Sequence, residues 1–507
     1  MNLVKINTIK MIREVNPVEK SRKKNLLVFP VGTIGRDMMY CLVTNFLLTY
    51  ILFAKGLTNA QLAAVTAIMV GARIFDALND PIMGNIIERT RTKWGKFKPW
   101  LLIGILSTSL VIYMVFNTNL TGWKFIWLFG IFYFLYSITY TMHDISYWGM
   151  IPALGSDANE RNQLTSRATL CSGIGSTLAS VLIPMLTTGA MTLGGNAKDA
   201  YGYVALAVAI AGPMFLFITI FGVKEQRDYL TETPPPISLK KIVKTIVSND
   251  QLVWISVIFL AQQIGNGIII GGLGSTYIYI EFGYNGSLYS IFTTVGMAAT
   301  AFLMIFYPMI SRHICRKKLM KIMLAISVIG YVLMFVTGIW MSATMTKFWL
   351  LVIGYMLSNF GMYCYYLIMM ISILNTVEYN ELKNGTRDEA IVASLRPFIT
   401  KMASAVTAII VSVSYMIFGI TDFTNRVSAL ENQAAEGLIT ETQKLTMIND
   451  VFSGITGSQT NGLMLCMTVL PCLLMVISFV LYMKKYILDE GEYDRICKEL
   501  ELRKKGN

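Results

Sequence analysis

The sequence predicts an all-α membrane protein with twelve transmembrane helices in two six-helix bundles. Hydrophobic residues make up 54% of its 507 residues and charged residues only 14%, and its mean hydropathy is +0.55. Soluble domains carry about a quarter charged residues, so these values exclude a globule surrounded by water. The apolar residues form long blocks, and a helix needs roughly 20 of them to cross a bilayer. The number of these blocks therefore excludes a single-span receptor. An outer-membrane β-barrel is also excluded, because its strands show only a weak alternation of apolar and polar residues.

Charged breaks divide the apolar sequence into twelve candidate spans. The first six are expected at 26-53, 59-88, 98-118, 122-154, 160-190 and 200-223. The second six are expected at 250-281, 286-310, 318-340, 346-378, 388-420 and 462-486. The predicted organisation is a tail, a bundle, a linker, a second bundle and a second tail, at 1-25, 26-223, 224-249, 250-486 and 487-507. Within the second bundle, the long polar loop 421-461 is expected either to fold as a short helix over the outer end or to be mobile.

The distribution of Lys and Arg predicts the orientation of the chain. With twelve spans both tails lie on one side of the membrane, and the loops on that side hold 33 of the 43 Lys and Arg residues, against 6 in the opposite loops. Positively charged loops stay in the cytoplasm. Both termini are therefore expected on the cytoplasmic side of the cell membrane. This topology explains the net charge of +13, so no nucleic-acid partner is needed to account for it.

The sequence offers little for a metal centre or an organic cofactor, and none is expected. His143 and His313 are the only histidines. The seven cysteines lack a C-x-x-C spacing, so they are interpreted as packing residues. The first 24 residues are basic and lack an apolar core, which indicates that no cleavable signal peptide is present.

The second span contains carboxylates at a depth where charge is unfavourable. A carboxylate in mid-bilayer costs about 2.5 to 3.5 kcal/mol on insertion scales, so such a residue is a functional candidate. Asp76, Asn79 and Asp80 stand at i, i+3 and i+4, which places three oxygen-bearing side chains on one helical face. Pro81 follows, and because it has no N–H it leaves the carbonyl of Ala77 without its usual partner. This group of oxygens suits a hard monovalent cation.

An alternative interpretation is that Asp76 and Asp80 pair with Arg73 and merely hold helices together. The other half of the chain offers an internal comparison. At the end of the eighth span, Tyr307 and Leu303 occupy the places that correspond to Asp80 and Asp76. Because a six-helix half can be built without these acids, their presence favours a functional reason.

The fourth span carries a polar column. Thr141, Asp144 and Trp148 share one face at i, i+3 and i+7. A carboxylate accepts hydrogen bonds from vicinal hydroxyls, and a flat aromatic ring packs on the apolar face of a sugar, so this column suits a sugar. A lone Trp such as Trp148 is more often a packing or interface residue, and the neighbouring His143 is interpreted as a packed neutral histidine.

Further charged residues are expected at the same depth in the first, fifth and eleventh spans, namely Arg36, Asp37, Arg167, Arg396 and Lys401. Without Arg73, the mid-membrane groups comprise four acids and four bases. A buried charged cavity requires such near-neutrality. A structural network of ion pairs would show the same balance, so the count indicates a polar cavity without naming its cargo.

The linker 224-249 separates the two sets of six spans. It contains Thr233-Pro-Pro-Pro236 followed by Lys240, Lys241 and Lys244, which indicates a connection with an amphipathic segment on the inner membrane surface. Two six-span halves joined in this way are typical of a transporter with its substrate site between the halves at mid-membrane. A helical bundle of another kind is also compatible with this evidence.

Two motifs carry a resemblance to a known family. They are Asp76-x-x-x-Asp80-Pro81-x-x-Gly84 and Thr92-Lys93-Trp94-Gly95-Lys96-Phe97-Lys98-Pro99-Trp100. Together they resemble the glycoside-pentoside-hexuronide:cation symporters, a branch of the major facilitator superfamily, in particular its melibiose permease-like members. The resemblance extends from Gly35-Arg36-Asp37 to Asp489-Glu490. It implies the major facilitator fold and a protein that works as a monomer.

The resemblance also implies roles for individual residues. It implies a site for Na+, Li+ or H+, with Na+ held by the two carboxylates, at Asp76, Asn79, Asp80 and Thr141. It implies a sugar site at Asp37, Asp144, Trp148 and Arg167, with further wall residues at Arg36, Tyr140, Tyr366 and Thr400. Lys401 resembles a lysine of the eleventh helix that lies close to both sites. The cytoplasmic gate motif of the superfamily corresponds to Arg91, Lys93, Gly95, Lys96 and Lys98.

Two residues depart from the melibiose permease-like pattern. Arg396 stands in place of a neutral amide, and Tyr366 stands in place of a Trp. A guanidinium that faces the cavity would recognise a carboxylate, which favours a hexuronide or glucuronide over a neutral disaccharide. The alternative is that Arg396 pairs with Glu378 or another acid.

The expected function is symport of a glycoside, oligosaccharide or hexuronide with a cation, in a lipid bilayer. Na+ is preferred over H+ because Asn79 offers a neutral oxygen, although paired aspartates also suit protonation. One alternative is a lysophospholipid carrier of the same fold, which would need an apolar side slot. A more distant one is a membrane-embedded transferase, which would need a catalytic cluster that the sequence lacks. An enzyme is therefore not expected.

Overall fold

The computed structural model describes residues 17-155, 158-225 and 239-506, and within these ranges it is α-helical without a β-strand. The N-terminal bundle contains α2 (Pro17–Cys41), η1 (Leu42–Phe46), α3 (Leu47–Ala54), α4 (Asn59–Arg89), α5 (Lys98–Phe116), α6 (Gly122–Gly149), α7 (Ile151–Leu154), α8 (Ala158–Thr187), η2 (Leu193–Gly195) and α9 (Ala197–Gly222). The second part begins with α10 (Leu239–Ser248), α11 (Asp250–Ile268), η4 (Ile269–Leu273), α12 (Gly274–Phe282), α13 (Gly286–His313) and α14 (Arg316–Trp340). It ends with α15 (Met345–Asn384), α16 (Glu389–Ile417), α17 (Ile420–Ala435), α18 (Glu441–Ser453), α19 (Gly457–Lys485) and α20 (Glu490–Gly506).

The prediction of twelve spans is confirmed. In the described part of the chain, eleven helices are long and apolar enough to cross a membrane, and α4 is the twelfth. It is bent by 42° between its segments Asn59–Asp76 and Asn79–Arg89. The bend therefore lies at the predicted cation site. The fourth span is shorter than predicted, because α6 ends at Gly149 and the short helix α7 follows it.

Local sequence explains where several helices begin and end. Thr58 and Gln61 form a capping box at the start of α4, in which each side chain accepts a hydrogen bond from the backbone of the other residue. This arrangement satisfies two N–H groups that the first helical turn leaves free. Helix α15 ends at Gly385, whose φ of 71° is a left-handed conformation that suits glycine.

The first and seventh spans are each interrupted by one π-helical turn, at corresponding positions in the two halves. These turns are η1, between α2 and α3, and η4, between α11 and α12. They contact each other at the interface between the bundles. Gly272 in η4 has a φ of 135°, which only glycine adopts readily, and the Tyr415 hydroxyl donates to its carbonyl at 2.9 Å. Interrupted helices at matching positions indicate the binding site in transporters built from repeats.

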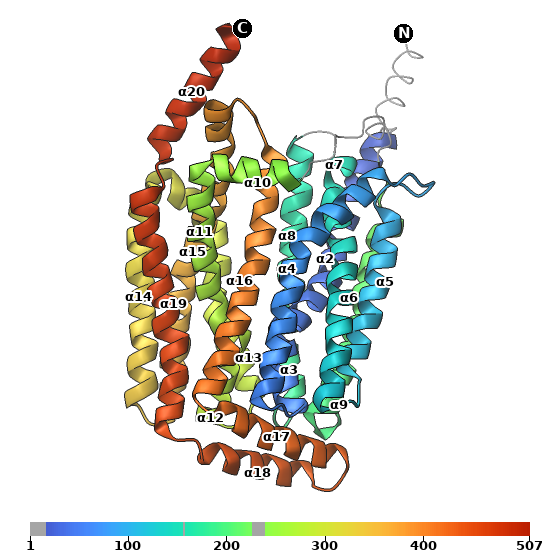
Figure 1. Ribbon diagram of the computed structural model, residues 1–507, viewed down its shortest axis with the longest axis vertical. Helices are drawn as coiled ribbons and strands as arrows, with labels where there is room; N and C mark the ends of the chain where they lie inside the picture. Colours follow the sequence, from blue (N-terminus) through green and yellow to red (C-terminus); the bar gives the residue numbers. More distant parts are fainter. Residues whose placement is uncertain (1–16, 156–157, 226–238, 507) are drawn as a thin grey trace, which may run out of the picture.

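The two bundles stand side by side, and both ends of the chain lie at the same end of the molecule (Figure 1). The bundles meet where α4 packs against α16 and where α8 packs against α13. Helix α10 runs across the ends of the second bundle on the side of the termini (Figure 1). The segment Thr233-Pro236 of the predicted linker lies outside the described residues.

The loop 421-461 folds as two helices, α17 and α18, which lie across the end opposite to the termini (Figure 1). Of the two expectations for this loop, the helical one therefore describes the structure. Apolar side chains that are at least nine-tenths buried hold this hairpin in place, among them Val427, Leu430, Ile448 and Phe452.

Candidate functional site

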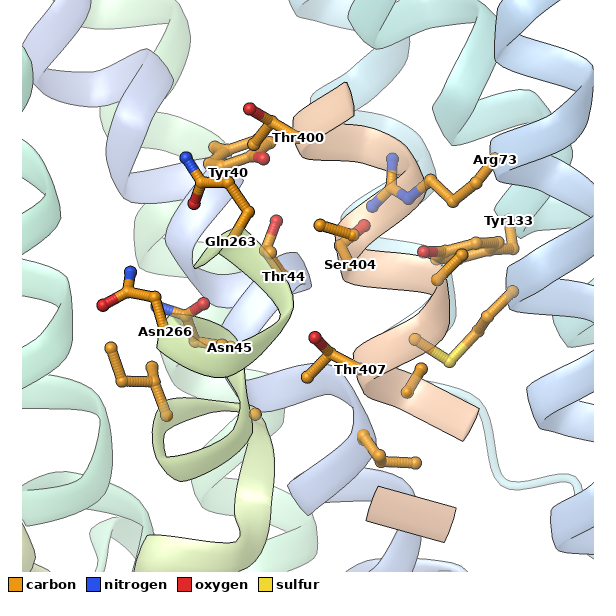
Figure 2. A pocket seen from close by; sticks show the side chains of 18 residues that line it. Tyr40, Thr44, Asn45, Arg73, Tyr133, Gln263, Asn266, Thr400, Ser404 and Thr407 are labelled. Atoms are coloured by element: carbon orange, nitrogen blue, oxygen red, sulfur yellow. The ribbon is translucent and has the colours of Figure 1, made fainter. Parts of the chain in front are cut away.

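A polar cavity of about 240 Å³ lies between the two bundles (Figure 2). Its walls come from the first, second and fourth spans of one bundle and from the seventh and eleventh spans of the other. The polar side chains around it are Tyr40, Thr44, Asn45, Arg73, Tyr133, Gln263, Asn266, Thr400, Ser404 and Thr407. The other eight lining residues are apolar or glycine, so the wall offers amides, hydroxyls and a guanidinium to the hydroxyl groups of a ligand beside apolar surface.

Of the residues predicted for the sugar site, Thr400 lines this cavity directly. The sequence did not single out the amides of Asn45, Gln263 and Asn266. A signal was present, because Gln263 and Asn266 stand at i and i+3 within an apolar span and so share a helical face. Buried amides on one face of a membrane helix are functional candidates for the same reason that buried acids are.

The predicted cation site forms a compact cluster around two carboxylates. The Thr141 hydroxyl donates to Asp80 Oδ1 at 2.9 Å. The Ser137 hydroxyl donates to Asp76 Oδ1. Ser137 lies one turn before Thr141 on the same face of α6, and the sequence reasoning missed it although this spacing was visible.

The ammonium of Lys401 lies between the two carboxylates. Its Nζ is 2.6 Å from Asp80 Oδ2 and 3.6 Å from Asp76 Oδ2. A single positive charge at this place contacts oxygens from both acids, as a bound monovalent cation would. Lys401 belongs to α16, so this contact joins the two bundles across 321 residues of sequence.

Arg73 serves only partly as the structural partner considered for these acids. Its guanidinium is 3.4 Å from Asp76 Oδ2, whereas the described contacts of Asp80 are with Thr141 and Lys401. Arg73 also lies 5.9 Å from the centre of the Tyr133 ring and lines the cavity (Figure 2). It therefore places a positive charge in the cavity wall.

Asn79 is buried beside the bend of α4, and its amide nitrogen has no hydrogen-bond partner among the described residues. No hydrogen bond joins Asn79 to either carboxylate in the part of the chain that the structure describes. No group of three or more His, Cys, Asp or Glu side chains that could hold a metal ion occurs there either. Two carboxylates with neighbouring hydroxyls fit a monovalent cation better than a divalent one, because divalent metals such as Ca²⁺ take six to eight oxygen ligands.

A second charged cluster is centred on Arg36. Its guanidinium donates to Asp37 Oδ2 and to Asp144 Oδ1, each at 2.9 Å. It also lies 5.0 Å from the centre of the Tyr147 ring and 5.1 Å from that of Trp148. The Asp144 side chain is 32% exposed, whereas that of Arg36 is 3% exposed. Arg36 therefore orients Asp144 while leaving part of the carboxylate open to a ligand.

The structure divides the predicted column of the fourth span between these two clusters. Thr141 contacts Asp80, whereas Asp144 and Trp148 contact Arg36. Tyr140 connects the Arg36 cluster to the cavity, because its ring lies 5.4 Å from that of Tyr40. The residues predicted to bind the cation and the sugar are therefore contiguous with the cavity residues along α6.

The remaining predicted sugar-site residues lie on the side of the cavity that faces the termini. Arg167 is exposed and donates to the carbonyl of Leu26 at 3.2 Å. Arg396 is exposed and donates to the Tyr366 hydroxyl at 2.6 Å. Glu378, which was considered as a partner of Arg396, instead pairs with Arg387 at 2.9 Å.

The predicted gate loop follows α4 and is folded against the end of α9. Gly95 has a φ of 114°, and a Cβ at this position would collide with the Glu225 carboxylate. Glu225 accepts a hydrogen bond from the Lys96 N–H at 3.1 Å, and burial raises the pKa of its carboxyl. Lys98 donates to the Val223 carbonyl at 2.8 Å.

The other gate residues lie nearby. The Lys96 ammonium pairs with Glu88 at 2.5 Å. Arg91 donates to the Glu88 carbonyl at 2.7 Å, and Lys93 is exposed. The sequence reasoning named the basic residues of this loop but missed their acidic neighbours Glu88 and Glu225.

Comparison with known proteins agrees with the fold. The family model described as MFS/sugar transport protein matches residues 28–490, and the chain belongs to this family. Its members are transporters, so the protein is a multi-pass membrane transporter and not an enzyme. The sugar-transporter resemblance read from the sequence is thereby confirmed.

Several characterised relatives are similar over much of the chain. The lactose permease of Lactobacillus helveticus is 28% identical over 493 residues, which are 93% of this chain and 71% of that protein. The raffinose carrier protein of Pediococcus pentosaceus is 26% identical over 496 residues, 94% of this chain and 71% of that protein. The lactose permease of Leuconostoc lactis is 27% identical over 78% of this chain. The match spans 63% of that permease, less than two thirds of its length.

Solved structures share the twelve-helix major facilitator fold. A bacterial homologue of the human lysosomal transporter Spinster, in an inward-facing and unoccupied conformation, has a TM-score of 0.58 at 12% identity and covers 93% of this chain and 98% of its own. A D-xylose-proton symporter has a TM-score of 0.57 at 12% identity, with coverages of 87% and 99%. The predicted fold class is confirmed.

Proposed function

We propose that this protein is a secondary active symporter that couples the influx of a cation to the uptake of a sugar or glycoside by alternating access. The observation that carries the proposal is the position of Lys401, whose ammonium lies between Asp76 and Asp80 beside the polar cavity. An ammonium held at these oxygens marks a place where a monovalent cation would be stabilised.

A cation that enters the site would compete with Lys401 for the two carboxylates. Lys401 follows Thr400 on α16 and precedes Ser404 by three residues, and both of these neighbours line the cavity. Release of the ammonium would therefore change the charge next to the bound sugar. Because linkage is reciprocal, sugar must favour cation binding by the same factor as cation favours sugar binding.

The sugar would bind in the cavity and against the Arg36 cluster. Asn45, Gln263 and Asn266 offer amide donors and acceptors, and Asp144 offers a partly exposed carboxylate. The similarity to a lactose permease and to a raffinose carrier supports a neutral oligosaccharide. Arg396, whose described partner is a hydroxyl, supports a substrate with a carboxylate. Transport of neutral and uronic substrates is therefore to be compared directly.

The arrangement of the bundles supports one conformation of the cycle. Hydrogen bonds across the bundle interface join Ser290 to the Val181 carbonyl and the Gly286 N–H to the Thr188 carbonyl, at the end opposite to the termini. With the termini in the cytoplasm, this corresponds to a molecule closed toward the outside. The structure would then correspond to the inward-facing state.

Transport assays in right-side-out membrane vesicles that contain the protein test the proposal. Radiolabelled lactose, raffinose and methyl glucuronide are supplied under an imposed Na+ gradient or an imposed pH gradient. Accumulation driven by Na+ at constant pH is expected, with Li+ as a partial substitute. Accumulation driven only by the pH gradient would identify H+, and not Na+, as the coupling ion. Equal uptake with and without either gradient would overturn symport, and uptake of a lysophospholipid in place of every sugar would overturn the substrate class.

A further inference from the structure

The hairpin formed by α17 and α18 belongs to one bundle by its chain connections and to both bundles by its contacts. It connects α16 to α19, which are helices of the second bundle. Helix α17 nevertheless packs against α3 and α9 of the first bundle. Figure 1 shows both helices running beneath the ends of the two bundles. The hairpin therefore crosses the interface that must open when the outer side opens.

The first polar contact across this interface involves Asn425. Its Oδ1 accepts from the Leu57 N–H at 2.7 Å, and its Nδ2 donates to the Leu57 carbonyl at 2.9 Å. One amide thus satisfies both backbone groups of a residue that follows α3. Backbone groups that leave water need such partners.

The second polar contact involves a fully buried ion pair. Glu431 and Lys444 have side chains with 0% exposure, and their Oε2 and Nζ atoms are 3.2 Å apart. The same Oε2 accepts from the Ala197 N–H at 2.6 Å, and Lys444 donates to the Gly195 carbonyl at 2.6 Å. Ala197 is the first residue of α9, so the carboxylate lies at the positive end of that helix.

These contacts connect chain segments that belong to different bundles. Glu431 and Lys444 lie on α17 and α18, whose ends continue into α16 and α19 of the second bundle, whereas Gly195 and Ala197 belong to the first. Separation of the first bundle from the hairpin would keep the ion pair but remove its two backbone partners and both hydrogen bonds of Asn425. The hydroxyls of Thr421 and Ser428 are already buried without a partner among the described residues. A few polar contacts thus hold the interface together, and some of its buried polar groups lack a hydrogen-bond partner in the described part of the chain.

We propose that the α17–α18 hairpin is an outer latch, which stabilises the outward-closed conformation through Asn425, Glu431 and Lys444 and so sets the balance between the two conformations of the transport cycle. The inference rests on the proposed alternating access. It assigns to the hairpin neither sugar nor cation binding, because the contacts that Asn425, Glu431 and Lys444 make with the first bundle are with its backbone.

The first test measures access from the outside. Ala408 lines the cavity, and Ala408→Cys is labelled in intact cells with a membrane-impermeant maleimide, with the unsubstituted chain as background. Asn425→Ala and Glu431→Gln are expected to increase the labelling rate by about 5- to 30-fold, the range that corresponds to losing one or two such contacts. Glu436→Gln is the matched control, because Glu436 is exposed at the end of the same helix. Equal rates in both latch variants and the control, at equal surface expression, would overturn the latch.

The second test holds the latch closed. Gly56 has a φ of 56°, so Gly56→Cys strains the backbone, and transport by the reduced double variant is the baseline. A Cβ at this position would lie 3.8 Å from the Ser428 Cβ, which is the usual Cβ separation in a disulfide. In the double variant Gly56→Cys with Ser428→Cys, oxidation is expected to stop transport, and reduction is expected to restore it. Transport that continues after complete oxidation would contradict the latch. Labelling of Ala408→Cys needs no sugar or cation, so failure of the latch and failure of symport give separate results.

Discussion

The proposed cation site makes its sharpest prediction at Asp80, where the substitution Asp80→Asn removes one negative charge with almost no change in volume. In the structure Asp80 accepts from Lys401 at 2.6 Å and from Thr141 at 2.9 Å. The Asn side chain can still accept from one of these donors, but it no longer carries a charge. Lys401 then retains only Asp76, at 3.6 Å.

The expected magnitude follows from the loss of one charged oxygen ligand of the bound cation, taken as comparable in strength to a charge-assisted hydrogen bond. Such a bond contributes about 1.5 to 3 kcal/mol, which corresponds to roughly 10- to 150-fold in affinity. The Asp80 side chain is 29% exposed, so water screens part of this effect and the lower half of the range is expected. Sugar exchange without a gradient should persist at a reduced rate, because the sugar contacts are separate.

The assay compares cation-driven accumulation with equilibrium exchange in the same vesicles, and it measures the cation dependence of thermal stability in the purified protein. Asp494→Asn is the matched control, because Asp494 is exposed on α20 far from the membrane interior. Accumulation by the Asp80→Asn variant at the normal rate and with the normal cation dependence would refute the assignment of the cation site.

Three further predictions concern the affinity for sugar, the preference for a charged substrate and the contacts of the linker helix α10. Asp144→Asn should raise the KM for sugar at least tenfold even at saturating cation. The reason is that Arg36 would lose one of its two carboxylate partners and the ligand would lose a hydrogen-bond acceptor. An unchanged KM would remove Asp144 from the sugar site. Arg396→Gln should weaken transport of a methyl glucuronide by about tenfold and that of a neutral galactoside by less than threefold, whereas equal losses would indicate a structural role. Although burial raises the pKa of Asp388, hydrogen bonds from Thr386, Lys241 and Thr245 lower it below its ordinary value of 3.8. The contacts of the ionised Asp388 carboxylate therefore stabilise the protein above its ordinary pKa. This stabilisation is lost as the pH falls through the lowered pKa. Thermal melts of wild type and Asp388→Asn between pH 3 and pH 7 should converge at the acid end, and parallel curves would contradict the contact.

The helices were predictable because their formation is local. In lipid each segment must satisfy its own backbone hydrogen bonds, so the length of each apolar block decides each span. Asp76 and Asp80 were also predictable, since a charged group at that depth is conspicuous in the sequence, whereas the place of Thr141 beside them followed from the family resemblance. Their pairing with Lys401 joins two helices 321 positions apart, and spacing within one helix carries no information about it.

The sequence by itself determined the twelve-helix architecture, the family and the acidic centre of the second span, because hydropathy and intramembrane charge act within single helices. The tertiary structure decided which helices face one another. It placed Gln263 and Asn266 opposite Arg73 across the cavity, divided the fourth span between two charged clusters, and folded the loop 421-461 across both bundles. These features depend on contacts between distant segments, whose geometry is set only when the two bundles pack together.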